Sequence, residues 1–185
     1  MSGDAFQVDL RGVVDLLARH LYSSPRVYLR ELMQNGVDAI TARRALGDGA
    51  PERIDLRALP GGGLEVSDTG IGLTGEDARD LLATIGRSSK RDVELGGGRE
   101  EFLGQFGIGL LSAFMVADEI DMVSRCARPA PDGGRAPAIR WRGFTDGRYE
   151  LTELADDDPA LAVLGDAPGS AVRLFPRRDA EHWLS

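Results

Sequence analysis

Helix-like and strand-like patterns occupy different parts of this chain, and this separation constrains the fold more than any other feature. Apolar residues recur at helical spacing in four segments: 13–21, 27–46, 74–86 and 107–118. Alternation typical of strands occurs in seven short segments: 6–10, 54–56, 64–66, 120–122, 139–141, 149–151 and 172–174. Helices come early and strands mostly late, so we predict an α+β two-layer sandwich. Helices should cover one face of a mixed, mostly antiparallel sheet.

Length and charge narrow the class of protein. The chain has 185 residues, which fits a single domain over residues 1–185. No apolar run approaches the roughly 20 residues that span a bilayer, and no signal peptide is expected at the start. The single cysteine, Cys126, is typical of a reducing compartment, so we expect a cytoplasmic protein without membrane contact. A net charge of −8 argues against a nucleic-acid interface.

Three polar residues, Glu31, Asn35 and Asp38, follow one another at helical spacing. At about 100° per residue they fall within roughly 60° of one another on a helix. Most such faces are simply solvated, but asparagine is a poor helix former, and Gly36 costs about 1 kcal/mol against alanine. An amide oxygen suits Mg²⁺, and a carboxylate one turn away can activate water. The other side of this helix should face the sheet with apolar residues: Leu29, Leu32, Met33 and Ile40.

The segment LEVSDTGIG, residues 64–72, places an aspartate at the end of a predicted strand. Gly70 and Gly72 allow the backbone to turn sharply after Asp68. Asp with Gly is also ordinary turn chemistry, so a plain turn is the alternative. In the functional interpretation, the carboxylate of Asp68 accepts a hydrogen bond from an amino group such as the exocyclic amine of adenine.

A glycine-rich run stands before the last helix-like segment and consists of Gly104, Gln105, Phe106, Gly107, Ile108 and Gly109. Free N–H groups and the positive dipole end at a helix start attract phosphates. The run lacks the Gly-Lys-Ser/Thr ending of a P-loop and the spacing of the dinucleotide fingerprint. Residues 86–103, rich in Gly, Ser and charge, are expected to form a mobile loop. The three motifs together predict a pocket for magnesium-ATP.

The combination resembles the gyrase, heat-shock, histidine-kinase and mismatch-repair ATPase superfamily. Within it, the chain resembles the N-terminal domain of the ninety-kilodalton heat-shock chaperone family, in particular its bacterial branch. Two phrases are specific to that family, LYSS…YLREL and GQFGIGLLSAFMVAD. The resemblance covers residues 6 to about 125 closely and the remainder loosely.

The resemblance implies a role for each motif residue. Glu31 falls on the catalytic glutamate, and Asn35 on the magnesium-binding asparagine. Asp38 falls on an acidic residue that lines the pocket, and Asp68 on the aspartate that binds adenine of ATP or ADP. Further nucleotide-binding positions are implied at Gly72, Leu73, Arg87, Ser88, Ser170 and the run Gly104–Gly109. Ser170 stands where the family usually has a threonine that helps a water bridge to adenine. Residues 84–109 would form a lid over ATP.

The chain departs from the family pattern at three leucines. Leu81 stands where the family commonly has an asparagine near the ribose, Leu73 replaces a usual methionine, and Leu110 a usual phenylalanine. The Leu81 departure removes a polar contact and is expected to weaken nucleotide affinity.

The family chain is much longer than this one. Its middle domain supplies an arginine to the γ-phosphate, and its C-terminal domain dimerises. The chain therefore reads as an excised N-terminal domain that ends near Trp183. We expect the isolated domain to be a monomer. The full-length protein should be a homodimer whose partners are client proteins and its own middle domain.

Other functions compete with a chaperone ATPase. A mismatch-repair or topoisomerase-like DNA enzyme would share the three motifs, but the acidic charge opposes it. A nucleotide-sensing module that does not hydrolyse ATP remains a second alternative, although the presence of Glu31 argues against it. A histidine kinase is disfavoured because no phospho-accepting helix precedes the domain.

Overall fold

The computed structural model describes residues 4–5, 26–88 and 109–184, with side chains from 26–81 and 109–182 and at Leu184. Its helices are α2 (Val27–Arg44) and α3 (Gly75–Ser88), and its 3-10 turns are η1 (Ala113–Met115), η2 (Pro159–Leu161) and η3 (Glu181–Trp183). Its strands are β1 (Asp4–Ala5), β2 (Ile54–Ala58), β3 (Leu64–Asp68), β4 (Ala117–Arg125), β5 (Ala138–Phe144), β6 (Arg148–Leu154) and β7 (Gly169–Pro176). The predicted segments at 6–10 and 13–21 lie outside the described residues.

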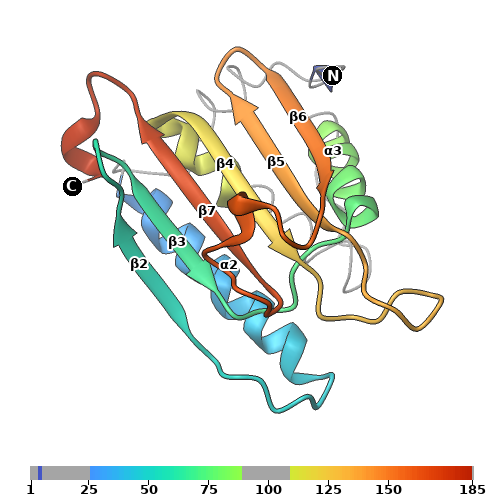
Figure 1. The fold of residues 1–185 in the computed structure, drawn as a ribbon. Helices are drawn as coiled ribbons and strands as arrows, with labels where there is room; N and C mark the ends of the chain where they lie inside the picture. Colours follow the sequence, from blue (N-terminus) through green and yellow to red (C-terminus); the bar gives the residue numbers. More distant parts are fainter. Residues whose placement is uncertain (1–3, 6–25, 89–108, 185) are drawn as a thin grey trace.

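The described strands form one sheet in the order β1-β6-β5-β4-β7-β3-β2 (Figure 1). Every ladder between them is antiparallel, so the expectation of a mixed sheet is wrong for this part of the chain. The last strand, β7, pairs with both β3 and β4 and so lies inside the sheet, next to the middle strand β4. Segments far apart in sequence therefore become neighbours in the middle of the molecule.

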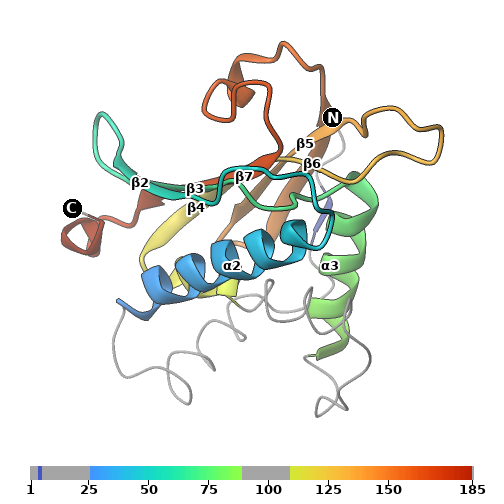
Figure 2. The ribbon, with the colours of Figure 1, turned by 90° about the horizontal axis from the view of Figure 1, so that it is seen from below.

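Helices α2 and α3 lie on the same face of the sheet (Figure 2), which confirms the predicted α+β sandwich. Two helix boundaries differ from prediction. The helix expected through residue 118 ends with the 3-10 turn at Met115, because the chain joins β4 from Ala117. The loop expected from residue 86 begins later, because α3 continues to Ser88. The rest of that loop lies outside the described residues.

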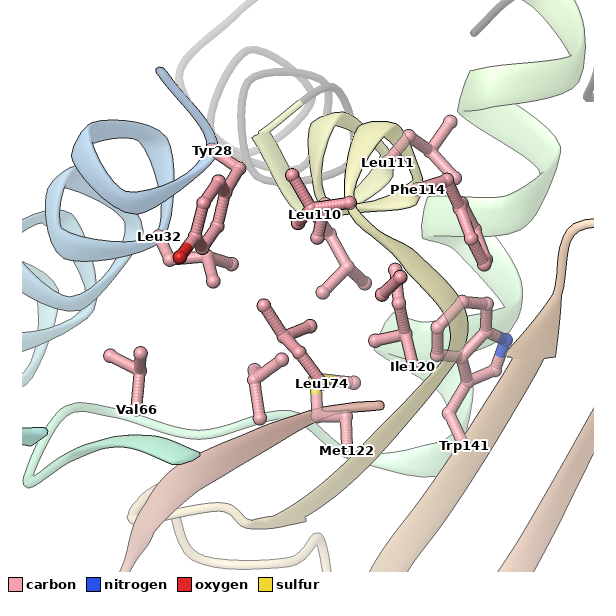
Figure 3. Packing of buried hydrophobic residues seen from close by; sticks show 14 of the residues in the cluster. Tyr28, Leu32, Val66, Leu110, Leu111, Phe114, Ile120, Met122, Trp141 and Leu174 are labelled. Carbon is pink, nitrogen blue, oxygen red and sulfur yellow. The ribbon is translucent and has the colours of Figure 1, made fainter. Parts of the chain in front are cut away.

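The main core fills the space between the helices and this face of the sheet (Figure 3). Inward strand residues pack against the helical residues that follow Gly109. The buried side chains labelled in the figure are Tyr28, Leu32, Val66, Leu110, Leu111, Phe114, Ile120, Met122, Trp141 and Leu174. Burying this apolar surface is the main force that holds the helices on the sheet.

Helix α2 packs on the sheet through a narrower stripe than the sequence suggests. Leu32 and Ile40 are buried as predicted, and Leu29 is partly buried, but Met33 is 40% exposed and faces away from the core. Its place in the stripe is taken by the small residues Gly36 and Ala39. These small side chains let the helix approach the sheet closely at the end where β3 finishes.

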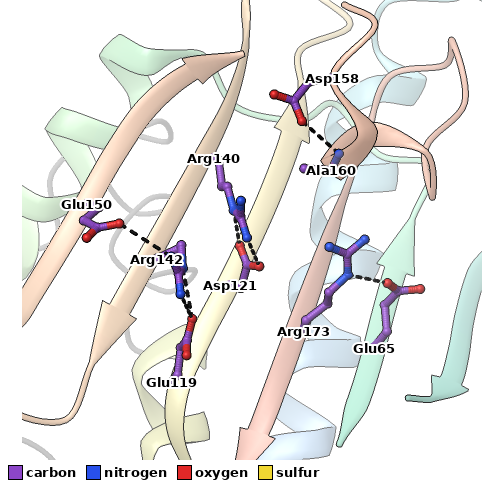
Figure 4. Close-up of polar contacts among 9 residues, drawn as sticks. All are labelled: Glu65, Glu119, Asp121, Arg140, Arg142, Glu150, Asp158, Ala160 and Arg173. Carbon is purple, nitrogen blue, oxygen red and sulfur yellow. Dashed lines mark hydrogen bonds and ion pairs between the residues drawn. The ribbon is translucent and has the colours of Figure 1, made fainter. Parts of the chain in front are cut away.

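The opposite face of the sheet is covered by ion pairs (Figure 4). Arg173 on β7 binds Glu65 on β3 at 2.8 Å, and Arg140 on β5 binds Asp121 on β4 at 2.7 Å. Arg142 lies 2.5 Å from Glu119. Glu65 and Asp121 are buried beneath these arginines. Acidic and basic side chains thus neutralise each other across neighbouring strands.

One end of this opposite face carries a small second core. Leu161 of η2 packs there against Val123, Ala138 and Ala171. The guanidinium of buried Arg125 holds the same segment, with Nη1 donating to the carbonyl oxygens of Gly165 at 2.7 Å and Ala167 at 3.0 Å. Among the described residues, no helix has the length and apolar character needed to cross a bilayer.

Candidate functional site

A polar row crosses three neighbouring strands on the helix-facing side of the sheet. Asp68 on β3 lies directly opposite Ser170 on β7, and Ser170 lies opposite Ser124 on β4. The neighbouring row on the same face, two residues away along each strand, is apolar and consists of Val66, Val172 and Met122. The apolar core therefore ends at a line of polar side chains. Buried polar groups in such a position need hydrogen-bond partners, from the protein or from a ligand.

The two serines of the row form a buried hydrogen-bond network. Their Oγ atoms are 2.7 Å apart, and the backbone N–H of Leu73 donates to Ser124 Oγ at 2.8 Å. A weaker contact joins Ser124 Oγ to the carbonyl oxygen of Gly169 at 3.3 Å. The network ties the loop after β3 to both β4 and β7. It places Ser170, implied by the resemblance, beside Asp68.

Asp68 has the most unusual electrostatics of the row. Burial raises the pKa of its carboxyl to about 7, although backbone hydrogen bonds from Gly70 and Ser170 act to lower it. The N–H of Gly70 donates to Oδ1 at 2.8 Å. The residue as a whole is half-buried, and the protein around its carboxyl removes most of the hydration of that group. Such a group favours a ligand that donates a hydrogen bond to it.

The loop after Asp68 is held between α2 and the end of β4. The N–H of Ile71 donates to the carbonyl oxygen of Ala39 at 2.9 Å, and a Cβ atom at Gly70 would collide with Ala39. Gly72 has a φ of +69°, and a Cβ atom there would collide with the carbonyl oxygen of Arg125. Both glycines are therefore required by close approach of backbone, and Gly72 also by its φ.

Replacing Gly72 by alanine is expected to lower the unfolding free energy by roughly 2–5 kcal/mol, since left-handed strain adds to a backbone clash. Gly47 is the matched control, because its φ of +65° is similar and nothing lies within 4 Å of a Cβ atom there. Gly47→Ala should lose only about 1–2 kcal/mol. Denaturant unfolding of both variants measures the difference. Equal losses would show that the approach of Arg125 is unimportant.

One turn of α2 brings the three sequence motifs together. The amide of Asn35 lies against Gly109, where a Cβ atom would be 2.9 Å from both Oδ1 and Nδ2. A Cβ atom at the next residue, Gly36, would be 3.5 Å from the Cβ of Asp68 and 2.9 Å from Ile54 Cδ1. Two consecutive helical residues thus contact the end of the glycine-rich run and the end of β3. Asn35 itself is 7% exposed.

The remaining α2 residues lie further toward the surface. Glu31, one turn before Asn35, has a side chain that is 23% exposed and 3.9 Å from Arg30. Asp38 accepts a hydrogen bond from Gln34 at 2.9 Å on the outer side of the helix. The structure thus gives Asp38 a partner on the surface of its own helix.

Several predicted site residues are only partly described or not described. Arg87 and Ser88 lie in the last turn of α3, where the backbone is described but the side chains are not. The positions 104–108 of the glycine-rich run lie outside the described residues, as does most of the predicted lid. Their contribution to the site stays a prediction.

The three departures from the family pattern share one environment. Leu73, Leu81 and Leu110 are 2–3% exposed and belong to the main core. Leu81 therefore contributes to packing at the position where a polar contact was expected to be lost.

A magnesium ion fits the donors at this turn in one specific way. No cluster of three or more His, Cys, Asp or Glu side chains suited to a metal occurs among the described residues. Mg²⁺ usually keeps several waters and takes only one or two protein ligands together with phosphate oxygens. The single buried amide oxygen of Asn35, with Glu31 one turn away, matches that mode of binding.

Two residues that build the site, Ser124 and Arg125, were not predicted from the sequence. Ser124 is a polar residue at an inward position of β4, two residues after the apolar Met122, and this break in the alternation was the available signal. Arg125 gave no signal, because its role depends on contacts with Gly165 and Ala167, which lie far along the chain.

Comparison with individual known proteins finds relatives that share one name. No family model matches the chain. It is 36% identical over 183 residues to "Chaperone protein HtpG" of Mesorhizobium japonicum, covering 92% of this chain and 27% of that protein. It is 31% identical to the protein of that name from Actinobacillus succinogenes, covering 97% of this chain and 29% of that protein.

A mitochondrial relative extends the similarity beyond bacteria. "Heat shock protein 75 kDa, mitochondrial" of Rattus norvegicus is 35% identical over 175 residues, covering 89% of this chain and 24% of that protein. The chain thus spans between 24% and 29% of the length of these relatives and matches their N-terminal part. Similarity at this level over most of the chain shows that it belongs to the heat-shock protein 90 family, as a counterpart of its N-terminal domain.

Proposed function

We propose that this chain is the nucleotide-binding domain of a molecular chaperone and that it binds and hydrolyses magnesium-ATP. The observation that supports this most is the convergence at one turn of α2. Asn35 lies against Gly109 there, and Gly36 lies against Asp68. An amide suited to a metal ion, the last residue of the glycine-rich run and a carboxyl suited to an amino group are thus close together. Magnesium-ATP carries the complementary groups.

Each part of the site is assigned one task. Asp68 accepts a hydrogen bond from the adenine amino group, and Ser170 supplies a second polar contact directly or through a water. The carboxamide oxygen of Asn35 would hold Mg²⁺, and the ion would neutralise charge on the phosphates. The N–H groups of the glycine-rich run that ends at Gly109 are assigned to the phosphate oxygens.

Glu31 is proposed as the general base that orients and activates the attacking water. A positioned base accelerates such reactions by about 10²–10⁴-fold, and the larger electrostatic contribution requires cationic groups around the γ-phosphate. Arg87 and Lys90 are the candidates in this chain, and the family resemblance places a further arginine in a domain beyond it. We therefore propose that this chain alone hydrolyses ATP slowly.

The relatives are much longer than this chain, so its partners are proposed for the whole protein. These are client proteins, the middle domain of the same polypeptide and a second copy in a homodimer. A nucleic-acid partner is disfavoured, because the arginines at the centre of the exposed sheet face are paired with Glu65, Asp121 and Glu119. A cytoplasmic location is proposed on the similarity to the bacterial relatives.

The test is a calorimetric titration with ADP, with and without Mg²⁺, on the parent chain and on Asn35→Ala. The parent should bind ADP more tightly with Mg²⁺ than without it. Asn35→Ala should remove that difference, because the variant lacks the amide oxygen that would ligate the ion. Gln34→Ala is not a suitable control, since Gln34 binds Asp38. Thr41→Ala, on the exposed side of the same helix, should keep the difference.

A parent chain that binds no adenine nucleotide would contradict the proposed function. A Mg²⁺ dependence that persists in Asn35→Ala would instead place the ion on other residues.

A further inference from the structure

The carboxyl of Asp68 has two oxygens with different roles. Oδ1 accepts the N–H of Gly70 at 2.8 Å, so it is held as an acceptor. The N–H of Ser170 is a second backbone donor to the carboxyl. Because each carboxyl oxygen has two lone pairs, Oδ2 can still carry the proton of the neutral carboxyl. Towards a ligand, Oδ2 accepts a hydrogen bond when the group is ionised and donates one when the group is protonated.

The hydroxyl pair of Ser170 and Ser124 has two possible directions. Their Oγ atoms are 2.7 Å apart, and either can donate to the other. When Ser124 donates to Ser170, the hydrogen of Ser170 is free for a ligand. When Ser170 donates to Ser124, the hydrogen of Ser124 turns to the carbonyl oxygen of Gly169 at 3.3 Å, and Ser170 offers only an acceptor. Leu73 N–H keeps its acceptor, Ser124 Oγ, in both arrangements.

We propose that the row Asp68–Ser170–Ser124 also binds 6-oxopurine nucleotides, because its donor and acceptor roles can invert together when Asp68 takes up a proton. This inference rests on the proposed nucleotide-binding function. It adds a second class of ligand at the same site.

Adenine and hypoxanthine present opposite arrangements of hydrogen-bond donors and acceptors. Each arrangement is complementary to one protonation state of the row. Adenine presents an amino donor beside the N1 acceptor, which matches ionised Asp68 and a donating Ser170. Hypoxanthine presents the O6 acceptor beside the N1–H donor, which matches protonated Asp68 and an accepting Ser170. A single bridging water preserves this sense, because it accepts on one side and donates on the other.

Burial places the protonation of Asp68 near neutrality, since the pKa of its carboxyl is raised to about 7. The charged groups on the packed elements have partners of their own. On α2, Arg43 binds Asp48 and the carbonyl oxygen of Thr69, and Asp38 binds Gln34.

Two further charged residues belong to the same surroundings. Arg53, which precedes β2, binds Asp55, and Glu31 lies on α2 beside Arg30. The described part of β7 next to Asp68 contributes the uncharged Ser170. Asp68 is therefore the group in this row whose titration changes the hydrogen-bond pattern.

The experiment measures the affinities of ADP and IDP for the parent chain from pH 6 to pH 8. Their ratio is used because both nucleotides carry the same titrating phosphates and bind the same metal. ADP requires the ionised fraction of Asp68 and IDP the protonated fraction. The preference for ADP should therefore grow about tenfold per pH unit, or about 100-fold over this range.

Asp68→Asn imitates the protonated carboxyl at every pH. The N–H of Gly70 holds the amide oxygen at the Oδ1 position, so the amide nitrogen faces the ligand as a donor. This variant should bind IDP with an affinity that does not depend on pH through Asp68, and should prefer it to ADP. Ser124→Ala removes the acceptor for the Ser170 hydrogen and should lower the IDP-to-ADP affinity ratio at pH 6 about tenfold.

The outcomes separate the two proposals. ADP binding with an IDP-to-ADP ratio that is constant with pH in the parent chain would overturn this inference and leave the proposed function standing. Absence of binding by both nucleotides at every pH would overturn the proposed function itself. If Ser124→Ala does not fold, the parent ratio and the Asp68→Asn variant still decide the question.

Discussion

Glu31→Ala is expected to reduce ATP turnover by about 10²–10⁴-fold, with a much smaller effect on ADP affinity. The reason is that a general base contributes in the transition state, whereas nucleotide binding depends on Asp68, Asn35 and the phosphate contacts. Turnover is measured with a coupled assay on this chain alone and on the full-length protein, with ADP binding titrated in parallel.

Two further variants sharpen the test of Glu31. Glu31→Gln keeps the size of the side chain but not its basicity, and should be as slow as the alanine variant. Thr41→Ala is the control for the helix, because Thr41 is exposed and binds only the carbonyl oxygen of Val37 among the described contacts. Normal turnover by Glu31→Ala would mean that another group activates the water.

Asp68→Asn is expected to weaken ADP binding by about 10- to 150-fold, because a charge-assisted hydrogen bond worth roughly 1.5–3 kcal/mol is lost. The amide nitrogen would face the adenine amino group, donor against donor. Calorimetry at pH 8, where Asp68 is ionised in the parent chain, measures the loss. Unchanged ADP affinity in the folded variant would remove Asp68 from adenine recognition.

The same substitution should remove a loss of stability that the parent chain undergoes as pH rises. The pKa of Asp68 is about 7 in the folded protein and near 3.8 when unperturbed, so the folded state binds this proton more tightly. The stabilising effect of the protonated group is complete below the unperturbed pKa and is lost as pH rises to the folded pKa. Between about pH 5 and 7, the parent should therefore lose roughly 2–3 kcal/mol relative to Asp68→Asn.

Denaturant unfolding of both proteins at these two pH values tests the linkage. A stability difference between parent and variant that does not change with pH would show that the carboxyl is not desolvated in the folded protein. Together, the two measurements describe a residue that destabilises the fold when ionised and supplies binding in the same state.

Segments with a strong local pattern were predicted well. The hairpin of β2 and β3 follows from alternation on both sides of Gly61–Gly63. Helix α3 begins at Gly75, close to the predicted start at residue 74, and the side chains of Thr74 and Asp77 each accept the other's backbone N–H. The helix predicted through residue 118 is present from Gly109, but its predicted end was wrong, since the apolar run after Gly109 suits helix or strand. Pairing of Ala117 with Pro176 on β7 decides for the strand.

The candidate site was also predictable from the sequence only in part. The sequence by itself determined the chemical types of the motifs: a carboxylate and amide at helical spacing, an aspartate at a strand end, and glycines before a helix. Only the tertiary structure placed β7 between β3 and β4, and so set Ser170 and Ser124 in line with Asp68. The physical reason is that strand neighbours and register depend on contacts between distant segments, which a local pattern of residues does not encode.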